Sequence, residues 1–434
     1  MFSKLFSLSQ NKLNYLYENS LFLQNIDKLI FVTIIGVFIT STFLSSDVIG
    51  FIALITIFLT LVKLLTCKGA KLDVKNFELW LLAYFMIVVI SLFGATLFYL
   101  SLKGFLKTFT YLGFYVSVAN YLKDNKRHIP LILGTIGLCV TFESLVGFMQ
   151  NFAHVSEIST WQDVSNLNPE EVMTRVYGTL KPLNPNLLGG YFVAGIPALF
   201  ACTAYCFIEK NYKNTIIWFV LALLACITLF LTGCRGSYIG LMVILAGIFA
   251  VSAKYLWQNY KKIYLSIIGA CFAFMTFAIL CVTSLRARVL SIFAMRQDSS
   301  NSFRFNVYHS SLEMFKDNWL LGIGVGNQNF REIYGLYMKT GFDALSAYNI
   351  FLEIAVESGI FALIAFLGFA ITLIKKAVGF IIQSQDVKRV IFVSATIISI
   401  CAVMVHGLVD TVFFRPQIQF IFWTMVAIAK NELE

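Results

Sequence analysis

The chain has 434 residues, of which 59% are hydrophobic and only 13% are charged. A composition this apolar excludes a soluble globular protein and indicates an integral membrane protein. The formal net charge of +10 is no argument for nucleic acid, because the basic residues are mostly lysines in short segments between apolar stretches, where they set topology and contact anionic lipid. We therefore expect membrane lipid and no nucleic acid as a partner.

Residues 1–28 lack the long apolar core and the small-residue cleavage site of a signal peptide. Apolar residues such as Phe2, Leu5 and Leu8 alternate there with polar ones, which predicts a short helix lying at the membrane surface.

Apolar stretches follow along the rest of the chain, most of them close to the 20 residues that span a bilayer. They predict an all-α polytopic membrane protein with about twelve transmembrane helices, and the signal is weakest at 102–122 and 418–429. The short loops on alternate sides hold nearly all the lysines, so the positive-inside rule puts these loops and both termini in the cytoplasm. The predicted spans are 29–44, 48–66, 78–99, 102–122, 129–150, 186–208, 214–232, 236–253, 263–282, 350–374, 390–412 and 418–429.

Two polar stretches, 151–185 and 283–349, interrupt this pattern, and the alternation places both outside. The chain then divides into a cytoplasmic interfacial segment (1–28), spans 1–9 with the outer loop 151–185 (29–282), a large outer loop between spans 9 and 10 (283–349), and spans 10–12 (350–434). Within the large loop, residues 302–319 have the periodicity of a surface helix. The glycines of 322–327 after it predict a bend.

Eight of the ten arginines fall on the outer side of this topology. Outer loops do not need arginine for topology, so we expect these residues to bind an anion. A planar guanidinium binds phosphate or diphosphate through two parallel hydrogen bonds and keeps its charge. The eight are Arg175, Arg235, Arg286, Arg288, Arg296, Arg304, Arg331 and Arg415.

Several ionisable groups lie in the outer halves of the spans, where burial of charge is expensive. One interpretation is structural pairing, of Glu353 with an arginine and of His406 with Asp410. Convergence of the whole set with the two outer loops instead favours a site at the outer membrane face. His309 and Glu313, one turn apart on the surface helix, fit a solvated pair. The nine cysteines have no metal-ligand spacing, so no metal is expected. The set comprises Glu143, Glu353, Glu357, His406, Asp410, Arg235 and Arg415.

Several motifs between about residues 130 and 415 resemble one membrane-protein family. Thr232-Gly-Cys-Arg235-Gly236-Ser is similar to a helix start of the O-antigen ligase and O-antigen polymerase (WaaL/Wzy) superfamily. Asn184-Pro-Asn-Leu-Leu-Gly-Gly-Tyr, Phe303-Arg304 and Gly322-Ile-Gly-Val-Gly-Asn resemble its other landmarks. The cyanobacterial IctB-like branch, for which inorganic-carbon transport was once proposed, is similar in Thr174-Arg175-Val-Tyr, Ser346-Ala-Tyr348-Asn349, His406-Gly-Leu-Val-Asp410 and Arg415-Pro-Gln.

The resemblance implies a GT-C-like glycosyltransferase of the bacterial cytoplasmic membrane that needs no cofactor. Its donor would be a polyprenyl-pyrophosphate glycan and its acceptor a glycan or glycolipid at the outer face. Arg235 and Arg304 would hold the diphosphate. The family usually has a histidine before the asparagine of the Tyr348-Asn349 pair, and tyrosine is a poor base at neutral pH. The base is then Glu353, His406 or His309, with Arg175, Tyr348, Asn349, Asp410 and Arg415 as substrate contacts.

Two other functions remain open. A bicarbonate or other anion transporter would use the same arginines to attract its ion, and an accessory membrane protein would have no turnover. A carrier usually has a site near mid-membrane that opens to each side in turn, whereas the charged groups here stop in the outer half. The cytoplasmic half of most spans is apolar, which favours the enzyme.

Overall fold

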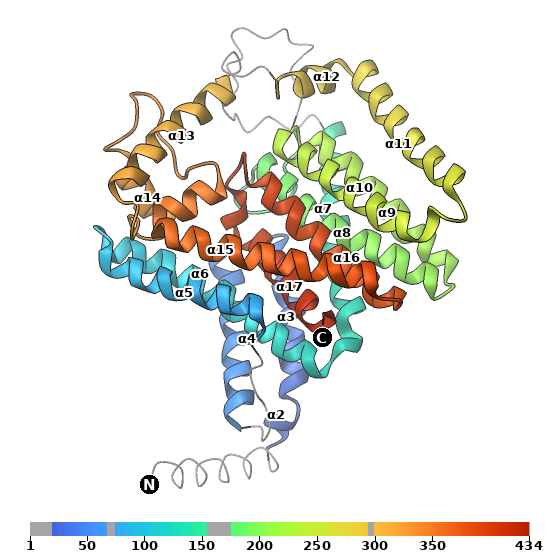
Figure 1. Ribbon diagram of the computed structural model, residues 1–434, viewed down its shortest axis with the longest axis horizontal. Coiled ribbons are helices and arrows are strands. Elements are labelled where there is room, and N and C mark those ends of the chain that lie inside the picture. The colour runs from blue at the N-terminus through green and yellow to red at the C-terminus, as the bar shows by residue number, and fades with distance from the viewer. Residues whose placement is uncertain (1–19, 67–73, 154–174, 294–298, 434) are drawn as a thin grey trace.

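A computed structural model describes residues 20–66, 74–153, 175–293 and 299–433, and their regular structure is entirely helical (Figure 1). This confirms the all-α prediction. The predicted surface helix of the N-terminus falls largely on residues 1–19 and most of the first outer loop on 154–174, both outside the described residues, as does Arg296.

The twelve predicted spans correspond to helices α3–α11 and α15–α17. In chain order the helices are α2 (Leu21–Gln24), α3 (Ile26–Ser41), α4 (Ser46–Thr66), α5 (Asn76–Gly94), α6 (Phe98–Asp124), η1 (Lys126–His128), α7 (Ile129–Phe152), α8 (Pro185–Ile208), α9 (Tyr212–Leu231), α10 (Arg235–Leu256), α11 (Lys261–Cys281), α12 (Thr283–Leu290), α13 (Ser299–Asp317), α14 (Asn327–Tyr334), α15 (Ile350–Gln383), α16 (Val387–His406), η5 (Val412–Phe414) and α17 (Pro416–Glu432).

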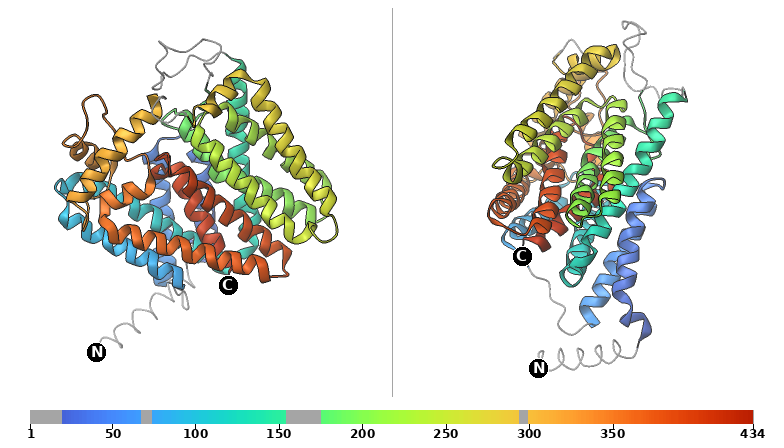
Figure 2. Two further views of the ribbon diagram at one scale, coloured as in Figure 1. Left: turned by 45° about the horizontal axis from the view of Figure 1, so that its top comes forward. Right: turned by 90° about the vertical axis from the view of Figure 1, so that its right-hand side faces the viewer.

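Within the described residues, nine helices are long and apolar enough to cross a membrane. The other three expected spans are α3 and α17, which have 16 and 17 residues, and α6, which carries Lys103 and Lys107 in its apolar stretch. α17 is buried on every side, packed against α6 and α16, while α11 lies at the edge of the bundle with almost all of its surface exposed (Figures 1 and 2). A helix enclosed by other helices does not need a strongly hydrophobic surface, which explains the weak signal at 418–429.

Three predicted spans have boundaries that are wrong by five residues or more. The span predicted at 350–374 continues to Gln383. The span predicted at 78–99 ends at Gly94, and α6 begins only at Phe98. The span predicted at 390–412 ends at His406, because the Asp410 carboxylate accepts hydrogen bonds from the backbone N–H groups of Thr411 and Val412 and so stabilises a turn.

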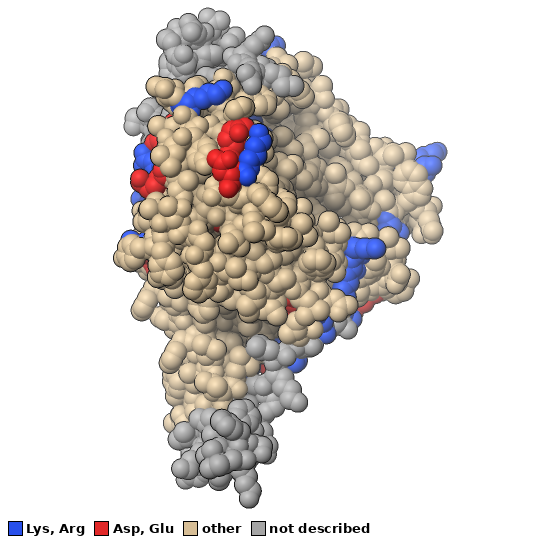
Figure 3. Space-filling model, turned by 60° about the vertical axis from the view of Figure 1, so that its left-hand side comes forward, with Lys and Arg blue, Asp and Glu red and all other residues tan. Residues whose placement is uncertain are grey.

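The two ends of the bundle carry different groups. At one end, ion pairs join helix termini: Lys63 with Asp27 (2.8 Å) and Lys430 with Glu78 (2.9 Å). The other end, formed by residues 175–184, 232–235, 282–293, 299–349 and 407–415, is here termed the arginine end. On the face in Figure 3, charged side chains gather towards the top and the lower right, and a broad area between them carries almost none. This nearly uncharged area and the nine apolar helices identify a multi-pass membrane protein.

The predicted surface helix and the glycine bend are both confirmed, as α13 and as Gly322–Gly326. The bend covers a break in α15 at Gly359, whose φ is 81°. Ile323 N and Gly324 N donate to the carbonyls of Val356 and Glu357, both at 2.9 Å. These bonds satisfy backbone groups that the break would otherwise leave buried without a partner.

Candidate active site

The turn before α10 lies at the centre of the arginine end. Arg175 Nε donates to the Thr232 carbonyl (2.8 Å), and Arg288 Nε donates to the Gly233 carbonyl (2.7 Å). Gly233 has a φ of +61°, and a Cβ there would lie 3.1 Å from the Arg175 side chain. Two guanidinium groups therefore enclose the turn that precedes Arg235, and they add to the positive end of the α10 dipole.

Arg235 and the first turn of α13, the helix that carries Arg304, meet at Ser291. Arg235 is almost fully buried, and its Nη1 donates to both the carbonyl and the hydroxyl of Ser291, each at 3.1 Å. Asn301 Nδ2, in the first turn of α13, donates to the same carbonyl (3.1 Å). Arg304 follows Asn301 by three residues on that helix. The sequence predicted both arginines in one site but gave no signal for Ser291.

Arg304 points towards the helices rather than away from them. Its guanidinium carbon lies 6.0 Å from the centre of the Tyr348 ring, and its Nη1 donates to Ser300 Oγ (2.9 Å). Its buried Nε has no hydrogen-bond partner among the described residues. A buried donor without a partner is rare in proteins and calls for an explanation, which an anion bound at Arg304 would supply.

Tyr348 and Asn349 join α13, α15 and the turn after α16. Tyr308 Oη donates to the Tyr348 carbonyl (3.2 Å), and Asn349 Nδ2 donates to the Leu408 carbonyl (3.1 Å). Burial, and next the negative charge of Asp410, raise the pKa of Tyr348 to about 12. The phenol is therefore neutral at physiological pH and does not act as a general base.

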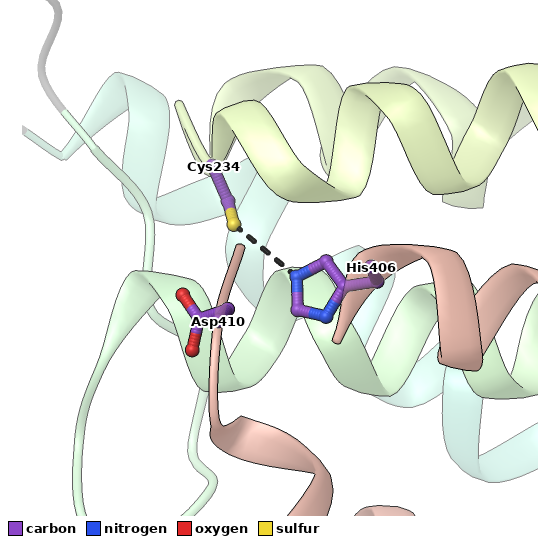
Figure 4. Close-up of side chains that lie close together, drawn as sticks. All are labelled: Cys234, His406 and Asp410. Carbon is purple, nitrogen blue, oxygen red and sulfur yellow. Dashed lines mark hydrogen bonds between the residues drawn. The ribbon is translucent and has the colours of Figure 1, made fainter. Parts of the chain in front are cut away.

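His406 lies against the beginning of α10. Its Nε2 is 3.7 Å from Cys234 Sγ, and a Cβ on Gly236 would lie 3.0 Å from its ring (Figure 4). Burial alone would raise the pKa of Cys234, but the hydrogen bond to His406 lowers it to about 7. Nothing in the sequence assigned a role to Cys234, because it resembled the other cysteines at the ends of apolar stretches.

Cys234, His406 and Asp410 are the one set of possible metal ligands within the described residues. All three are buried, and their donor atoms lie within 4.8 Å of one another (Figure 4). Sulfur, imidazole and carboxylate donors suit zinc. However, Arg175 acts electrostatically on both Cys234 and Asp410, and one Asp410 oxygen already binds two backbone N–H groups. A further cation fits this surrounding poorly, so we assign no metal to it.

The remaining ionisable groups do not all join this cluster. Glu353 accepts a hydrogen bond from Thr411 Oγ1 (2.7 Å), next to the turn that contains Asp410 and Arg415. Glu357 instead accepts a hydrogen bond from Gly326 N (2.8 Å) and so stabilises the glycine bend. Glu143 accepts hydrogen bonds from the backbone N–H and the hydroxyl of Thr179 and so stabilises the end of the first outer loop.

His309 is exposed on α13. Its predicted partner Glu313 forms its hydrogen bond with Lys316 (2.8 Å). Both observations fit the solvated interpretation of this pair.

The glycines after Asn184-Pro185-Asn186 let α8 approach the site. A Cβ at Gly189 would lie 2.3 Å from Ser237 Oγ, and a Cβ at Gly190 would lie 3.3 Å from His406 Cε1. Asn186 Oδ1 accepts a hydrogen bond from Arg175 Nη2 (2.5 Å). Segments that are far apart in the sequence thus meet around Arg175, Arg235 and His406.

Residues 220–367 match a protein family described as O-Antigen ligase. This match covers about one third of the chain, from within α9 to within α15. It includes Arg235, Arg304, Tyr348, Asn349 and Glu353, but not Arg175, His406, Asp410 or Arg415. No curated protein matches the chain. The match supports the similarity to the O-antigen ligase and polymerase superfamily.

Proposed function

We propose that this protein transfers a glycan from a polyprenyl-diphosphate lipid to a sugar acceptor at the outer face of the bacterial cytoplasmic membrane. The observation that carries the proposal is the arrangement of four arginines at one end of the bundle. Arg175 and Arg288 bind the turn that precedes Arg235, and Arg304 lies on α13, whose first turn shares Ser291 with Arg235. The similarity to O-antigen ligases supports the same reaction class.

In the proposed reaction, a hydroxyl of the acceptor attacks the anomeric carbon of the donor glycan. The bond between that carbon and the diphosphate oxygen breaks, and the electron pair leaves with the diphosphate. The proton of the hydroxyl passes to a base. Negative charge grows on the leaving diphosphate, so positive groups aimed at it stabilise the transition state.

Arg235 and Arg304 are the proposed diphosphate ligands. Both come from elements tied to Ser291, and Arg304 has a buried Nε–H that no described residue accepts. Arg175 and Arg288 hold the turn before Arg235 through backbone carbonyls and add positive potential. Arg415, Asn349 and Asp410 are proposed contacts of the glycan or the phosphate.

His406 is the base that we favour in place of the family histidine. Its ring packs on Gly236, the residue directly after Arg235, whereas Glu353 lies beyond Thr411 and the turn of Asp410. A base at His406 must be neutral before the reaction, so acid conditions that protonate it should stop turnover. His406→Gln should remove this pH dependence together with most of the rate, roughly 10²–10⁴-fold.

The proposed topology puts the arginine end outside and both termini in the cytoplasm. It rests on the lysine-rich loops of the opposite end and the positive-inside rule. Single cysteines replacing Gly335 and Gln258, in a chain without its native cysteines, test it. A membrane-impermeant thiol reagent should label position 335 in intact cells and leave 258 unlabelled. Labelling at 258 alone would reverse the topology.

The arginine assignment is tested by Arg235→Lys and Arg304→Lys, each of which keeps the charge and loses the planar fork. Transfer from a polyprenyl-diphosphate glycan in membranes should fall about 10²–10³-fold, with protein level and folding unchanged. Arg331→Lys is the matched control, because Arg331 is exposed and pairs with Asp343 (2.6 Å). Equal activity of all three variants would refute the assignment.

Anion transport is the competing function. A small anion requires positive potential more than a bidentate fork, so the lysine variants should then keep most of their activity. Labelled bicarbonate would enter liposomes that contain the purified protein and no lipid donor. Such uptake, weakened by neutral replacements of Arg235 and Arg304, would replace the proposal.

A further inference from the structure

Two lysines of α6 lie in the span predicted at 102–122, and neither has a role in the site described above. Lys103 and Lys107 are one turn apart and both are exposed. Lys107 lies about 14 Å along the helix from Phe98, at a rise of about 1.5 Å per residue. An exposed cation in an apolar helix is expensive in a bilayer and points to a function or a partner.

The surroundings of Lys107 are set by contacts on either side of it. Three residues earlier, Gly104 packs so closely on the glycine bend that a Cβ would lie 2.3 Å from the Val325 carbonyl. Four residues later, Tyr111 Oη lies 3.5 Å from the Phe414 carbonyl. The part of α6 that carries Lys107 therefore lies between a contact with the glycine bend and a contact with the turn that precedes α17.

Arg415 belongs to that turn and is the next cation towards the site. In the described part of the chain, its half-buried side chain has no hydrogen bond or ion pair, and the same holds for the Lys107 ammonium. Arg415 acts electrostatically on Tyr111, Tyr348 and Glu353. Arg415 is thus within electrostatic range both of Tyr111 on α6 and of Tyr348, whose ring lies beside the Arg304 guanidinium.

The carboxylates near these cations have other partners. Glu357 is within electrostatic range of Lys107 but hydrogen-bonds Gly326 N, and Glu353 hydrogen-bonds Thr411. Lys103 reaches no carboxylate among the described residues and instead lies over the Tyr99 ring, 4.7 Å from its centre. The lysines and Arg415 are therefore placed to attract an anion from outside the chain.

We infer that Lys103, Lys107 and Arg415 form an access subsite for the diphosphate of a membrane lipid, which reaches Arg304 along α6 from the bilayer. This inference rests on the proposed function for the identity of the lipid. A polyprenyl tail stays in the hydrocarbon, so its diphosphate approaches laterally at headgroup depth. On the way from there to Arg304 the diphosphate loses part of its hydration shell, and the exposed lysines of α6 can replace that water with charge-assisted hydrogen bonds.

The test is binding, not turnover. The full-length protein in zwitterionic nanodiscs is titrated with a polyprenyl diphosphate that carries no sugar. Separate titrations use phosphatidylglycerol and inorganic pyrophosphate. The Lys103→Gln/Lys107→Gln double variant should bind the polyprenyl diphosphate about tenfold more weakly than wild type. Lys123→Gln, at the other end of the same helix, should bind it normally.

The double variant should lose less affinity for phosphatidylglycerol and for inorganic pyrophosphate than for the polyprenyl diphosphate. Unchanged polyprenyl-diphosphate binding by the double variant would overturn the inference. An equal loss for phosphatidylglycerol would overturn it in favour of general attraction to anionic lipid, and an equal loss for pyrophosphate would overturn the lipid route.

The outcome is separable from that of the proposed function. Intact binding by the double variant, together with transfer that Arg304→Lys abolishes, refutes only the access subsite. Weakened binding in a protein that never transfers a glycan refutes only the reaction.

Discussion

Gly236→Ala tests whether the position of His406 against α10 matters for activity. The added Cβ would lie 3.0 Å from His406 Cδ2 and Val409 Cγ2, and 3.2 Å from His406 Nε2. Ordinary carbon contacts are about 3.5–4.0 Å, so the ring has to move by about half an ångström. The substitution removes no polar group of the site.

The expected magnitude follows from that displacement. A misplacement of about 1 Å can cost on the order of 10²-fold in rate, so half of it should cost roughly tenfold. Overpacking typically destabilises by about 1–3 kcal/mol, and the better helix propensity of alanine returns up to about 1 kcal/mol. The loss of rate should therefore exceed what the modest loss of stability explains.

The assay is the initial rate of glycan transfer by purified Gly236→Ala in liposomes, with thermal unfolding measured on the same sample. Gly269→Ala in α11 is the control, since no atom lies within 4 Å of its added Cβ. The control should keep full activity. Wild-type rates in Gly236→Ala, at normal expression, would show that His406 does not need this position and would refute its role as base.

Three further predictions concern the surrounding structure. Tyr348→Phe should lower transfer less than about tenfold and leave the pH–rate profile between pH 6 and 9 unchanged, because the phenol, with a pKa of about 12, carries no charge there; a lost limb of the profile would contradict this. Gly104→Ala should reduce the amount of folded protein, measured by size exclusion in detergent, because its Cβ would lie 2.3 Å from the Val325 carbonyl; normal yield would show that α6 can move. Glu357→Gln should keep the bond to Gly326 N and the thermal stability, whereas Glu357→Ala should lose about 1–3 kcal/mol; equal stability of the two would mean that this bond does not fasten the bend.

The sequence was sufficient for the helices, because apolar length and lysine placement depend on the membrane itself. It was less reliable where a local side chain ends a helix, as Asp410 does after His406. The motifs also located Arg235, Arg304 and Tyr348 at one end of the chain's bundle. They could not show that Ser291 accepts hydrogen bonds from both Arg235 and Asn301, since these residues come from separate elements.

Cys234 and Glu143 show why the site could not be completed from sequence. Cys234 acquires its distinct chemistry only from contact with His406, which is 172 residues away. Glu143 looked like a site residue because it is charged and lies in a span, yet Thr179 satisfies both of its oxygens. Whether a charge in a span is functional depends on which partner the fold gives it.

The most direct test of the central claim follows both products of one reaction. Purified protein in liposomes is supplied with a polyprenyl-diphosphate glycan and a sugar acceptor, and the lengthened glycan and the freed polyprenyl diphosphate are quantified together. The account predicts that the two appear in equal amounts and that both vanish in Arg235→Lys and Arg304→Lys. Neither product with wild-type protein, together with bicarbonate uptake in the absence of donor, would contradict it.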